Sequence, residues 1–219
     1  MDLDDPLRLV HEYVQRMMAW LLFMDAATVP KRQAMQLGLG AGALTKFCAK
    51  RLRMKTVAIE CNPLVLQACH MWFALPADGL RQQVVLADAA QEIQSERWWG
   101  CIDALQVDLY DQEAAAPVLD SVSFYEHCRR LLSADGCMTV NLFGRASSFQ
   151  RSVEKMASAF GAESLWSFKP TREGNTVVLA QRSAGGPKPA LMSSHALEIE
   201  RQWDLPARKW ARILKPLAS

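Results

Sequence analysis

The chain has 219 residues, of which 50% are hydrophobic and 22% are charged, and its formal net charge is +2. This composition excludes a disordered chain, a collagen-like repeat and a coiled coil, and the small net charge gives no indication of a surface for nucleic acid. The length is sufficient for one domain with appendages, but it is short for two domains and a linker.

The longest uninterrupted apolar run covers residues 17–24, and these eight residues are too few for a bilayer-spanning helix, which needs roughly 20. The amino terminus is acidic, with Asp2, Asp4 and Asp5, whereas a secretory signal begins with positive charge. The histidines and cysteines are dispersed without the spacing of metal ligands. We therefore expect a cytoplasmic protein without a metal ion, a membrane partner or a nucleic-acid partner.

Apolar residues recur at helical spacing from Pro6 to Met24, which predicts one amphipathic helix inside a helical N-terminal segment at residues 1–33. A short strand at 34–38 then runs into a glycine-rich turn, and a helical pattern follows at 43–52. Beyond it strands and helices alternate, with strands expected at 56–60, 83–86, 102–107, 137–142, 163–168 and 176–181, and helices at 62–73, 89–96, 119–132 and 147–160.

Strands that alternate with helices favour a mostly parallel sheet with helices on both faces. The sequence thus predicts a seven-stranded α/β domain of Rossmann-like type over residues 34–182. Residues 183–219 begin with a linker rich in glycine and proline and continue with a helical pattern at 194–214. We expect this C-terminal helix to pack on the surface of the domain.

Glycines form a Gly-x-Gly-x-Gly turn between the first predicted strand and the helix that follows it. Gly38, Gly40 and Gly42 allow a sharp turn and leave no side chain between the main chain and a ligand at the helix N-terminus. Glu60, at the end of the next strand, is placed to accept hydrogen bonds from ribose hydroxyls. Together these residues predict that the chain binds an adenosine-containing ligand.

Two further acids, Asp88 and Asp108, follow the ends of successive strands. Because the carboxyl ends of parallel strands line one crevice, we expect both to converge with the glycine loop on one cleft. Asp88 has two interpretations, a contact with the adenine amino group or the N-cap of the helix that begins at Ala89. Residues 103–126 include six acids and no lysine or arginine, a bias that predicts attraction of a cation.

The order and content of these motifs resemble the spermidine synthase-like polyamine aminopropyltransferases over roughly residues 7–182. The segments that carry the resemblance are Gly38-Leu39-Gly40-Ala41-Gly42, Val57-Ala58-Ile59-Glu60-Cys61-Asn62-Pro63, Asp88-Ala89, Ile102-Asp103-Ala104, Asp108-Leu109-Tyr110-Asp111, Phe124-Tyr125 and Leu131-Leu132-Ser133-Ala134-Asp135-Gly136. The resemblance implies the class I methyltransferase fold. It also implies transfer of the aminopropyl group of decarboxylated S-adenosylmethionine to an amine.

The resemblance implies roles for single residues. Asp108 matches the catalytic aspartate, a general base and counter-ion for a small cationic amine, and Asp111 matches its amine-binding partner. Tyr110, between them, is a further candidate for the acceptor pocket. Contacts with the S-adenosyl co-substrate are implied for Gly38, Gly40, Gly42, Glu60, Asp88 and Ala89.

Gln36 departs from the pattern of many methyltransferases, which carry an acid just before the glycine loop. A glutamine at this position is expected to remove one negative charge near the sulfonium or amino group of the co-substrate.

Two other functions stay open. A methyltransferase that uses ordinary S-adenosylmethionine is favoured because the chain is expected to lack the small amino-terminal domain that members of the resembled family usually carry. A non-catalytic nucleoside-binding homologue is the third interpretation, in which Leu109 and Tyr110 fill the amine pocket. A homodimer is one possible assembly, since a neighbouring subunit would complete the cleft.

Overall fold

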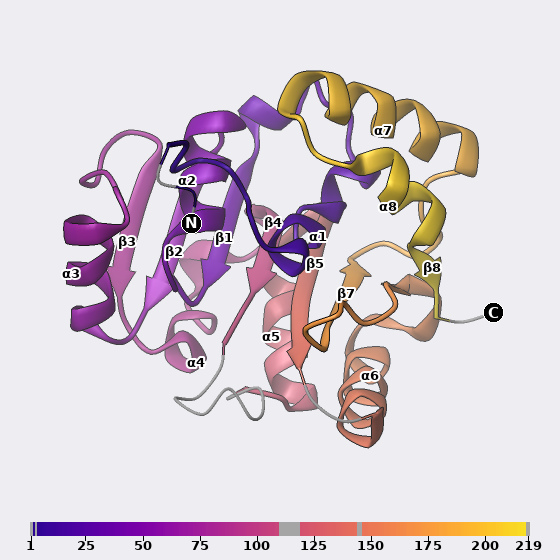
Figure 1. Ribbon diagram of the computed structural model, residues 1–219. Coiled ribbons are helices and arrows are strands. Elements are labelled where there is room, and N and C mark those ends of the chain that lie inside the picture. The colour runs from indigo at the N-terminus through magenta and orange to yellow at the C-terminus, as the bar shows by residue number, and fades with distance from the viewer. Residues whose placement is uncertain (1, 3, 110–118, 144–145, 218–219) are drawn as a thin grey trace.

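The computed structural model describes residues 2, 4–109, 119–143 and 146–217, and their strands form one mixed sheet (Figure 1). The strand order is β3-β2-β1-β4-β5-β7-β6-β8. The strands are β1 (Gln33–Leu37), β2 (Lys55–Glu60), β3 (Gln82–Leu86), β4 (Ile102–Val107), β5 (Leu132–Phe143), β6 (Leu165–Ser167), β7 (Asn175–Gln181) and β8 (Lys215–Pro216). The pairs among β1 to β5 are parallel, whereas β7 is antiparallel to β5 and β6.

The predicted Rossmann-like class I methyltransferase fold is confirmed, and the seven expected strands are all present within the described residues. The expected strand number was too low by one. The additional strand, β8, consists of two residues that pair with β6 at the edge of the sheet. Such a short strand leaves no alternation of apolar and polar residues by which a sequence pattern indicates it.

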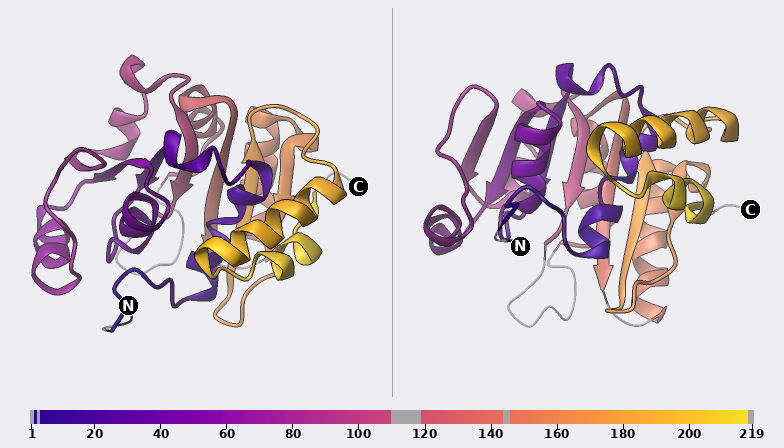
Figure 2. Two further views of the ribbon diagram at one scale, coloured as in Figure 1. Left: turned by 90° about the horizontal axis from the view of Figure 1, so that it is seen from above. Right: turned by 45° about the horizontal axis from the view of Figure 1, so that its top comes forward.

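Helices cover both faces of the sheet. They are α1 (Glu12–Arg16), α2 (Ala43–Lys46), α3 (Pro63–Trp72), α4 (Ala89–Glu92), α5 (Val122–Leu131), α6 (Ala146–Phe160), α7 (Pro189–Trp203) and α8 (Ala207–Ile213). Residues of α5 and α6 pack into one apolar cluster with alternate residues of β1, β4 and β5. The N-terminal segment, α7 and α8 form a second cluster on the opposite face, where Figure 2 shows them side by side.

The N-terminal segment is not the single amphipathic helix that its spacing predicts. Helix α1 ends at Arg16, and the next helical turn is a 3₁₀ turn, η1 (Ala19–Phe23). The run from Met17 to Leu22 is fully buried, so it has no polar face to present to water. Its backbone is paired instead by the sheet, because the Met17 carbonyl accepts from Thr139 Oγ1 at 2.9 Å and from Gln106 Nε2 at 3.3 Å.

We expect Thr139→Val to lower the free energy of unfolding by about 1–3 kcal/mol, since it leaves the buried Met17 carbonyl with only its longer hydrogen bond. A matched control is Thr56→Val, because the buried Thr56 hydroxyl makes only a 3.4 Å contact with the nearby Met54 carbonyl. Urea denaturation of both variants measures the difference. Equal losses would contradict a role of Thr139 in holding the N-terminal segment.

The C-terminal helix expected at 194–214 is two helices, because the chain turns between them. Asp204 takes the left-handed conformation at φ +54°, and Pro206 disfavours a helical conformation for the residue before it. The two helices nevertheless bury Ile199 and Trp210 against the N-terminal segment. None of the helices in the described part of the chain is both long enough and apolar enough to cross a bilayer.

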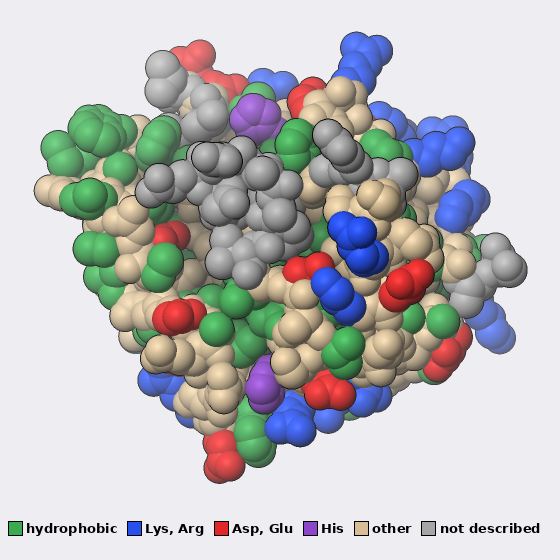
Figure 3. Space-filling model, turned by 90° about the horizontal axis from the view of Figure 1, so that it is seen from below, with side chains coloured by type: hydrophobic (Ala, Val, Ile, Leu, Met, Phe, Trp, Pro, Cys, Tyr) green, Lys and Arg blue, Asp and Glu red, His purple; other side chains and the backbone are tan. Residues whose placement is uncertain are grey.

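Figure 3 looks at the molecule from the side at which β1 to β5 end. The glycine loop, Asp88 and Asp108 follow these strand ends in the chain, and Glu60 is the last residue of β2. Helix α3 lies at one side of the molecule (Figure 1), and its apolar side chains Leu64, Met71 and Trp72 are exposed.

Candidate functional site

The glycine loop leaves β1 with three left-handed residues, Gly38 at φ +89°, Gly40 at +51° and Gly42 at +68°. Gly38 lies so close to the end of β4 that a Cβ there would be 2.5 Å from the carbonyl oxygen of Asp108. A Cβ on Gly40 would meet no atom within 4 Å, so the loop presents bare backbone at this residue. The loop is therefore close-packed against Asp108 at its first glycine and open at its second, as an approaching ligand requires.

Glu60 joins the glycine loop to the start of α3. Its Oε2 accepts from the Leu39 N–H at 3.1 Å, and its Oε1 accepts from the Asn62 N–H at 2.8 Å. Asn62 in turn caps α3, since its side chain accepts from the Leu64 N–H. Glu60 is 9% exposed, so this carboxylate supports the loop from within. The predicted contact of Glu60 with ribose stays a prediction.

Asp88 is the N-cap of α4, with its Oδ1 accepting from the Ala90 N–H at 2.7 Å. The capping interpretation is therefore confirmed. Asp88 is exposed and Ala89, the first residue of α4, is buried. Contacts of either residue with adenine stay predictions.

Asp108 follows β4 directly and is held from two sides. Asn141 Nδ2, on β5, donates to Asp108 Oδ1 at 2.9 Å, and the Tyr13 hydroxyl of α1 donates to the same carboxylate. Burial raises the pKa of Asp108 above its ordinary value, while the two donors act in the opposite direction. Burial also raises the pKa of Tyr13 to about 12, with a further contribution from the negative charge of Asp108.

A cavity of about 190 Å³ lies between the glycine loop, Asp108 and the N-terminal segment. Tyr13 and Asp108 line it together with Gly38 and Gly40, so the structure brings the loop and the predicted base to one hollow. Two residues that the sequence did not single out, Arg8 and His11, line the same cavity. Within the described residues, His, Cys, Asp and Glu side chains nowhere gather in threes as metal ligands would.

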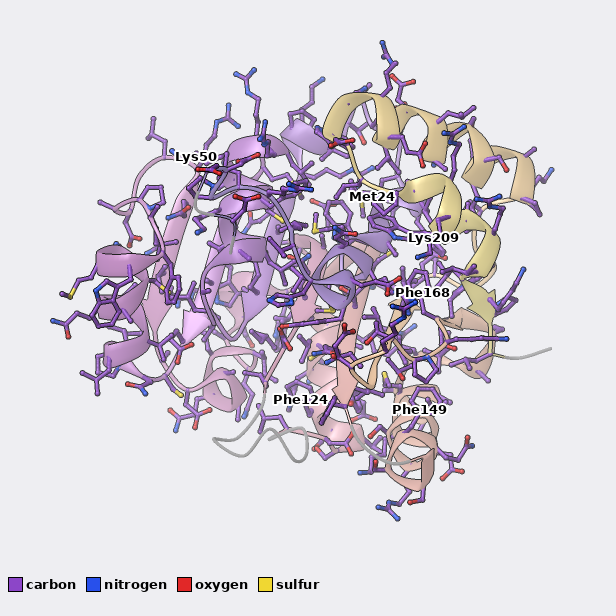
Figure 4. All side chains as sticks on the ribbon, viewed as in Figure 1. Met24, Lys50, Phe124, Phe149, Phe168 and Lys209 are labelled. Atoms are coloured by element: carbon purple, nitrogen blue, oxygen red, sulfur yellow. The ribbon has the colours of Figure 1, made fainter. Side chains whose placement is uncertain are left out.

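Helix α1, which carries Tyr13, is fixed at both of its sides. Glu12 Oε1 accepts from Arg16 Nη2 and from Lys209 Nζ of α8, both at 2.9 Å. The Arg16 guanidinium also lies over the Phe168 ring, 5.2 Å from its centroid. Lys209 and Phe168 are labelled beside α1 in Figure 4. The N-terminal segment thus closes the cavity on one side as a fixed wall.

Gln36 lies in the core, and its expected effect on the co-substrate stays a prediction. Its side chain is 1% exposed and donates through Nε2 to Gln106 Oε1 at 2.7 Å, within the core beneath the N-terminal segment. Alternation along β1 explains this result, because Gln36 shares a face with Ala34, whereas its neighbours Met35 and Leu37 face the opposite helices. The residue therefore pairs with its neighbour in the parallel register, Gln106, and it is not among the residues that line the cavity.

Two predicted substrate residues, Tyr110 and Asp111, lie outside the described residues. In their place the structure adds Tyr13 and Asn141 as neighbours of Asp108. A signal for Asn141 was present, because it is a polar residue inside the otherwise apolar strand pattern at 137–142, two positions after Thr139 and so on the same face. Tyr13 was noticeable by its place before the sheet, but its spacing did not match the resembled family well enough to assign it a role.

The chain is similar to known transferases. It is 30% identical to the polyamine aminopropyltransferase of Chromobacterium violaceum in an alignment of 221 positions. The alignment covers 98% of this chain and 80% of that relative. A probable spermidine synthase from Corynebacterium glutamicum has a similar structure, with a TM-score of 0.68, 21% identity, and coverage of 94% of this chain and 79% of that chain. Human methyltransferase-like protein 13, solved in complex with SAH, has a TM-score of 0.78 at 19% identity, over 88% and 92% of the two chains.

A comparison with models of protein families finds none that matches the chain. The likeness to the two solved structures establishes the fold, and the sequence identity to the Chromobacterium protein over four fifths of its length establishes the relationship. The chain therefore belongs to the spermidine synthase-like polyamine aminopropyltransferase family, whose members are transferases.

Proposed function

We propose that the chain transfers the aminopropyl group of decarboxylated S-adenosylmethionine to a small cationic amine, with Asp108 as the general base. One observation carries the proposal above all. A partly buried carboxylate, held by Tyr13 and Asn141, shares a cavity with a glycine loop whose second glycine presents bare backbone. The membership of the family supports the choice of reaction.

Asp108 has two roles in the proposed reaction, as a counter-ion and as a base. A protonated amine must lose a proton before its nitrogen can attack the propyl carbon beside the sulfonium. The C–S bond breaks as the C–N bond forms, and its electron pair stays on sulfur, which leaves as a neutral thioether. An ionised Asp108 attracts the cation and accepts that proton. The raised pKa makes the carboxylate a stronger base than an exposed aspartate, while the bonds from Tyr13 and Asn141 fix its direction.

The proposed donor site begins at the glycine loop and extends beyond the cavity, whose lining does not include Glu60, Asp88 or Ala89. We propose that Gly38, Gly40 and Gly42 accommodate the donor with their backbone, that Glu60 binds ribose, and that Asp88 and Ala89 contact adenine. The fixed carboxylate of Glu60 supports this assignment, because an acceptor held in place loses little entropy on binding hydroxyl groups. Tyr110 and Asp111 complete the proposal as acceptor-binding residues.

One observation favours a second candidate, methyl transfer from ordinary S-adenosylmethionine. Arg8 and His11 line the cavity, and a guanidinium is complementary to the carboxylate that S-adenosylmethionine carries and its decarboxylated form lacks. Arg8 is already paired with Asp2 at 3.2 Å, and its side chain is 69% exposed. Because Arg8 is exposed and already paired, the argument for methyl transfer is weaker than the argument for aminopropyl transfer.

Calorimetric titration and thermal unfolding with both nucleosides distinguish the two functions. We expect decarboxylated S-adenosylmethionine to bind more tightly, and at about 100 times its Kd to stabilise the chain by about 2.7 kcal/mol, a rise in Tm of roughly 5–10 °C. Tighter binding of S-adenosylmethionine, lost in an Arg8→Ala variant, would establish the second candidate. Assays with putrescine as the acceptor then test aminopropyl transfer directly.

A further inference from the structure

We infer that Asn175, which does not touch Asp108, is a positioning residue for this carboxylate and acts through Asn141. The inference rests on the proposed function, because it gives a reason for the position of Asn175 only if Asp108 works as a base. The three residues come from three different segments. Asp108 follows β4, Asn141 lies in β5 and Asn175 begins β7.

A chain of two hydrogen bonds connects Asn175 to the base. Asn175 Nδ2 donates to Asn141 Oδ1 at 3.1 Å, and Asn141 Nδ2 donates to Asp108 Oδ1 at 2.9 Å. Asn141 is 3% exposed, so water does not readily replace either partner. The hydrogen bond from Asn141 to Asp108 therefore depends on the hydrogen bond from Asn175 to Asn141.

The direction of these bonds selects the ionised form of Asp108. A side-chain amide has one oxygen, which accepts, and one NH₂ group, which donates. Because Asn175 donates to the oxygen of Asn141, the NH₂ group of Asn141 is left to face Asp108. An ionised carboxylate can only accept, so this orientation suits the form that a base needs before it takes a proton. Replacement of Asn175 removes the printed donor that keeps the Asn141 oxygen away from Asp108. An Asn141 oxygen turned toward Asp108 would favour a protonated carboxyl group.

The turn before β7 fixes Asn175 in place. The Asn175 N–H donates to Thr171 Oγ1 at 3.3 Å, and its carbonyl accepts from the Thr171 N–H at 2.8 Å. Asn175 also pairs in antiparallel register with Phe143 at the end of β5. The backbone of Asn175 is thus held in place at the start of β7, and a positioning residue requires such a fixed backbone.

Other groups near Asp108 stay unchanged when Asn175 is replaced. Among the residues that the structure describes, Tyr13 of α1 is the titratable group in contact with the carboxylate, and Arg8 and His11 face the same cavity from the residues before α1. The lining residues contributed by the described glycine loop and by α2 are uncharged. If the replacement of Asn175 changes the pKa of Asp108, we therefore attribute the change to a new orientation of the Asn141 amide.

The test is a ¹³C NMR titration of the Asp108 carboxyl carbon in the full chain, assigned by its loss in Asp108→Asn. In Asn175→Ala we expect the pKa of Asp108 to move upward, in the same direction as in Asn141→Leu and by no more than in that variant. In an aminopropyl transfer assay we expect kcat near neutral pH to fall about tenfold, with KM for the amine changed less and the acid limb of the pH profile moved to higher pH. The matched control is Gln181→Ala, which removes an amide from the other end of β7.

Asn175→Leu keeps the shape of the side chain and serves where Asn175→Ala does not fold. An unchanged titration of Asp108 in either folded variant, or a shift of the same size in Gln181→Ala, overturns the inference. The NMR titration needs no substrate, so the two proposals fail separately. If the titration shifts and no amine is alkylated, the inference stands and the proposed function is wrong. If the wild-type chain transfers aminopropyl groups and the titration does not shift, the inference is wrong and the function stands.

Discussion

Asp108→Asn is expected to lower kcat for aminopropyl transfer by about 10²–10⁴, because an amide cannot accept the proton of the attacking amine. Binding of the nucleoside donor should be little changed, since the glycine loop and Glu60 keep their own hydrogen bonds. Initial rates with decarboxylated S-adenosylmethionine and putrescine, together with calorimetry of donor binding, measure the two effects. Turnover at the wild-type rate would show that the base has been wrongly assigned.

The same substitution should stabilise the chain. Burial raises the folded-state pKa of Asp108 above its ordinary value of 3.8, so the folded state holds this proton more tightly than the unfolded state. Stability of the wild type is therefore lost as pH rises from 3.8 to the folded-state pKa, and the cost persists above it. The Asp108→Asn variant does not have this cost. Urea denaturation at pH values from 5 to 9 should show that the free energy of unfolding of the variant exceeds that of the wild type by an amount that grows with pH and then levels off. A difference that does not depend on pH would contradict the raised pKa of Asp108 in the folded state.

Gly38→Ala should have the largest effect on folding, a loss of at least about 3 kcal/mol in the free energy of unfolding. The residue has φ +89°, which strains an alanine, and the added Cβ would lie 2.5 Å from the Asp108 carbonyl oxygen. That oxygen belongs to backbone, which is fixed because the Asp108 N–H donates to the Leu37 carbonyl at 3.0 Å. Relief of the clash must therefore separate β1 from β4 or displace Asp108.

Gly40→Ala is the matched control for Gly38→Ala. Gly40 is also left-handed, at φ +51°, but a Cβ there meets no atom within 4 Å. We expect a loss of about 1 kcal/mol from backbone strain alone. Denaturant unfolding without ligand measures the loss in the free energy of unfolding of each variant. The difference between the two losses gives the contribution of the close approach of Gly38 to Asp108. Equal losses would show that strain, and not this contact, makes a glycine necessary at position 38.

The sequence predicts the α/β architecture because its local signals are strong and agree with one another. Buried strands such as 56–60 end at an acid, and Asn62 with Pro63 begins a helix whose cap the structure contains. Asp108 was also predictable as a neighbour of the glycine loop, since parallel strands end on one side of a sheet. Each of these features depends on residues close together in the chain.

The features that the sequence did not predict depend on distant partners. The spacing between Pro6 and Met24 is helical, yet the carbonyl group of Met17 is paired with side chains from β4 and β5. Asn141 and Asn175 are 34 positions apart and lie in strands whose pairing is antiparallel. Their relation to Asp108 requires the register of β5 against both β4 and β7, which no local pattern provides.

The position of the terminal helices has a consequence for the synthesis of the protein. Trp20 and Leu22 share an apolar cluster with Ile199 and Trp210, although nearly the whole chain separates them. On the ribosome the first pair emerges early and the second emerges late. Helix α1 lies shortly before Trp20 in the chain, so the cluster that packs around this segment is complete only after α7 and α8 have left the ribosome. Until then the apolar run from Met17 to Leu22 lacks the part of its cover that α7 and α8 provide, and exposed apolar surface of this kind favours aggregation.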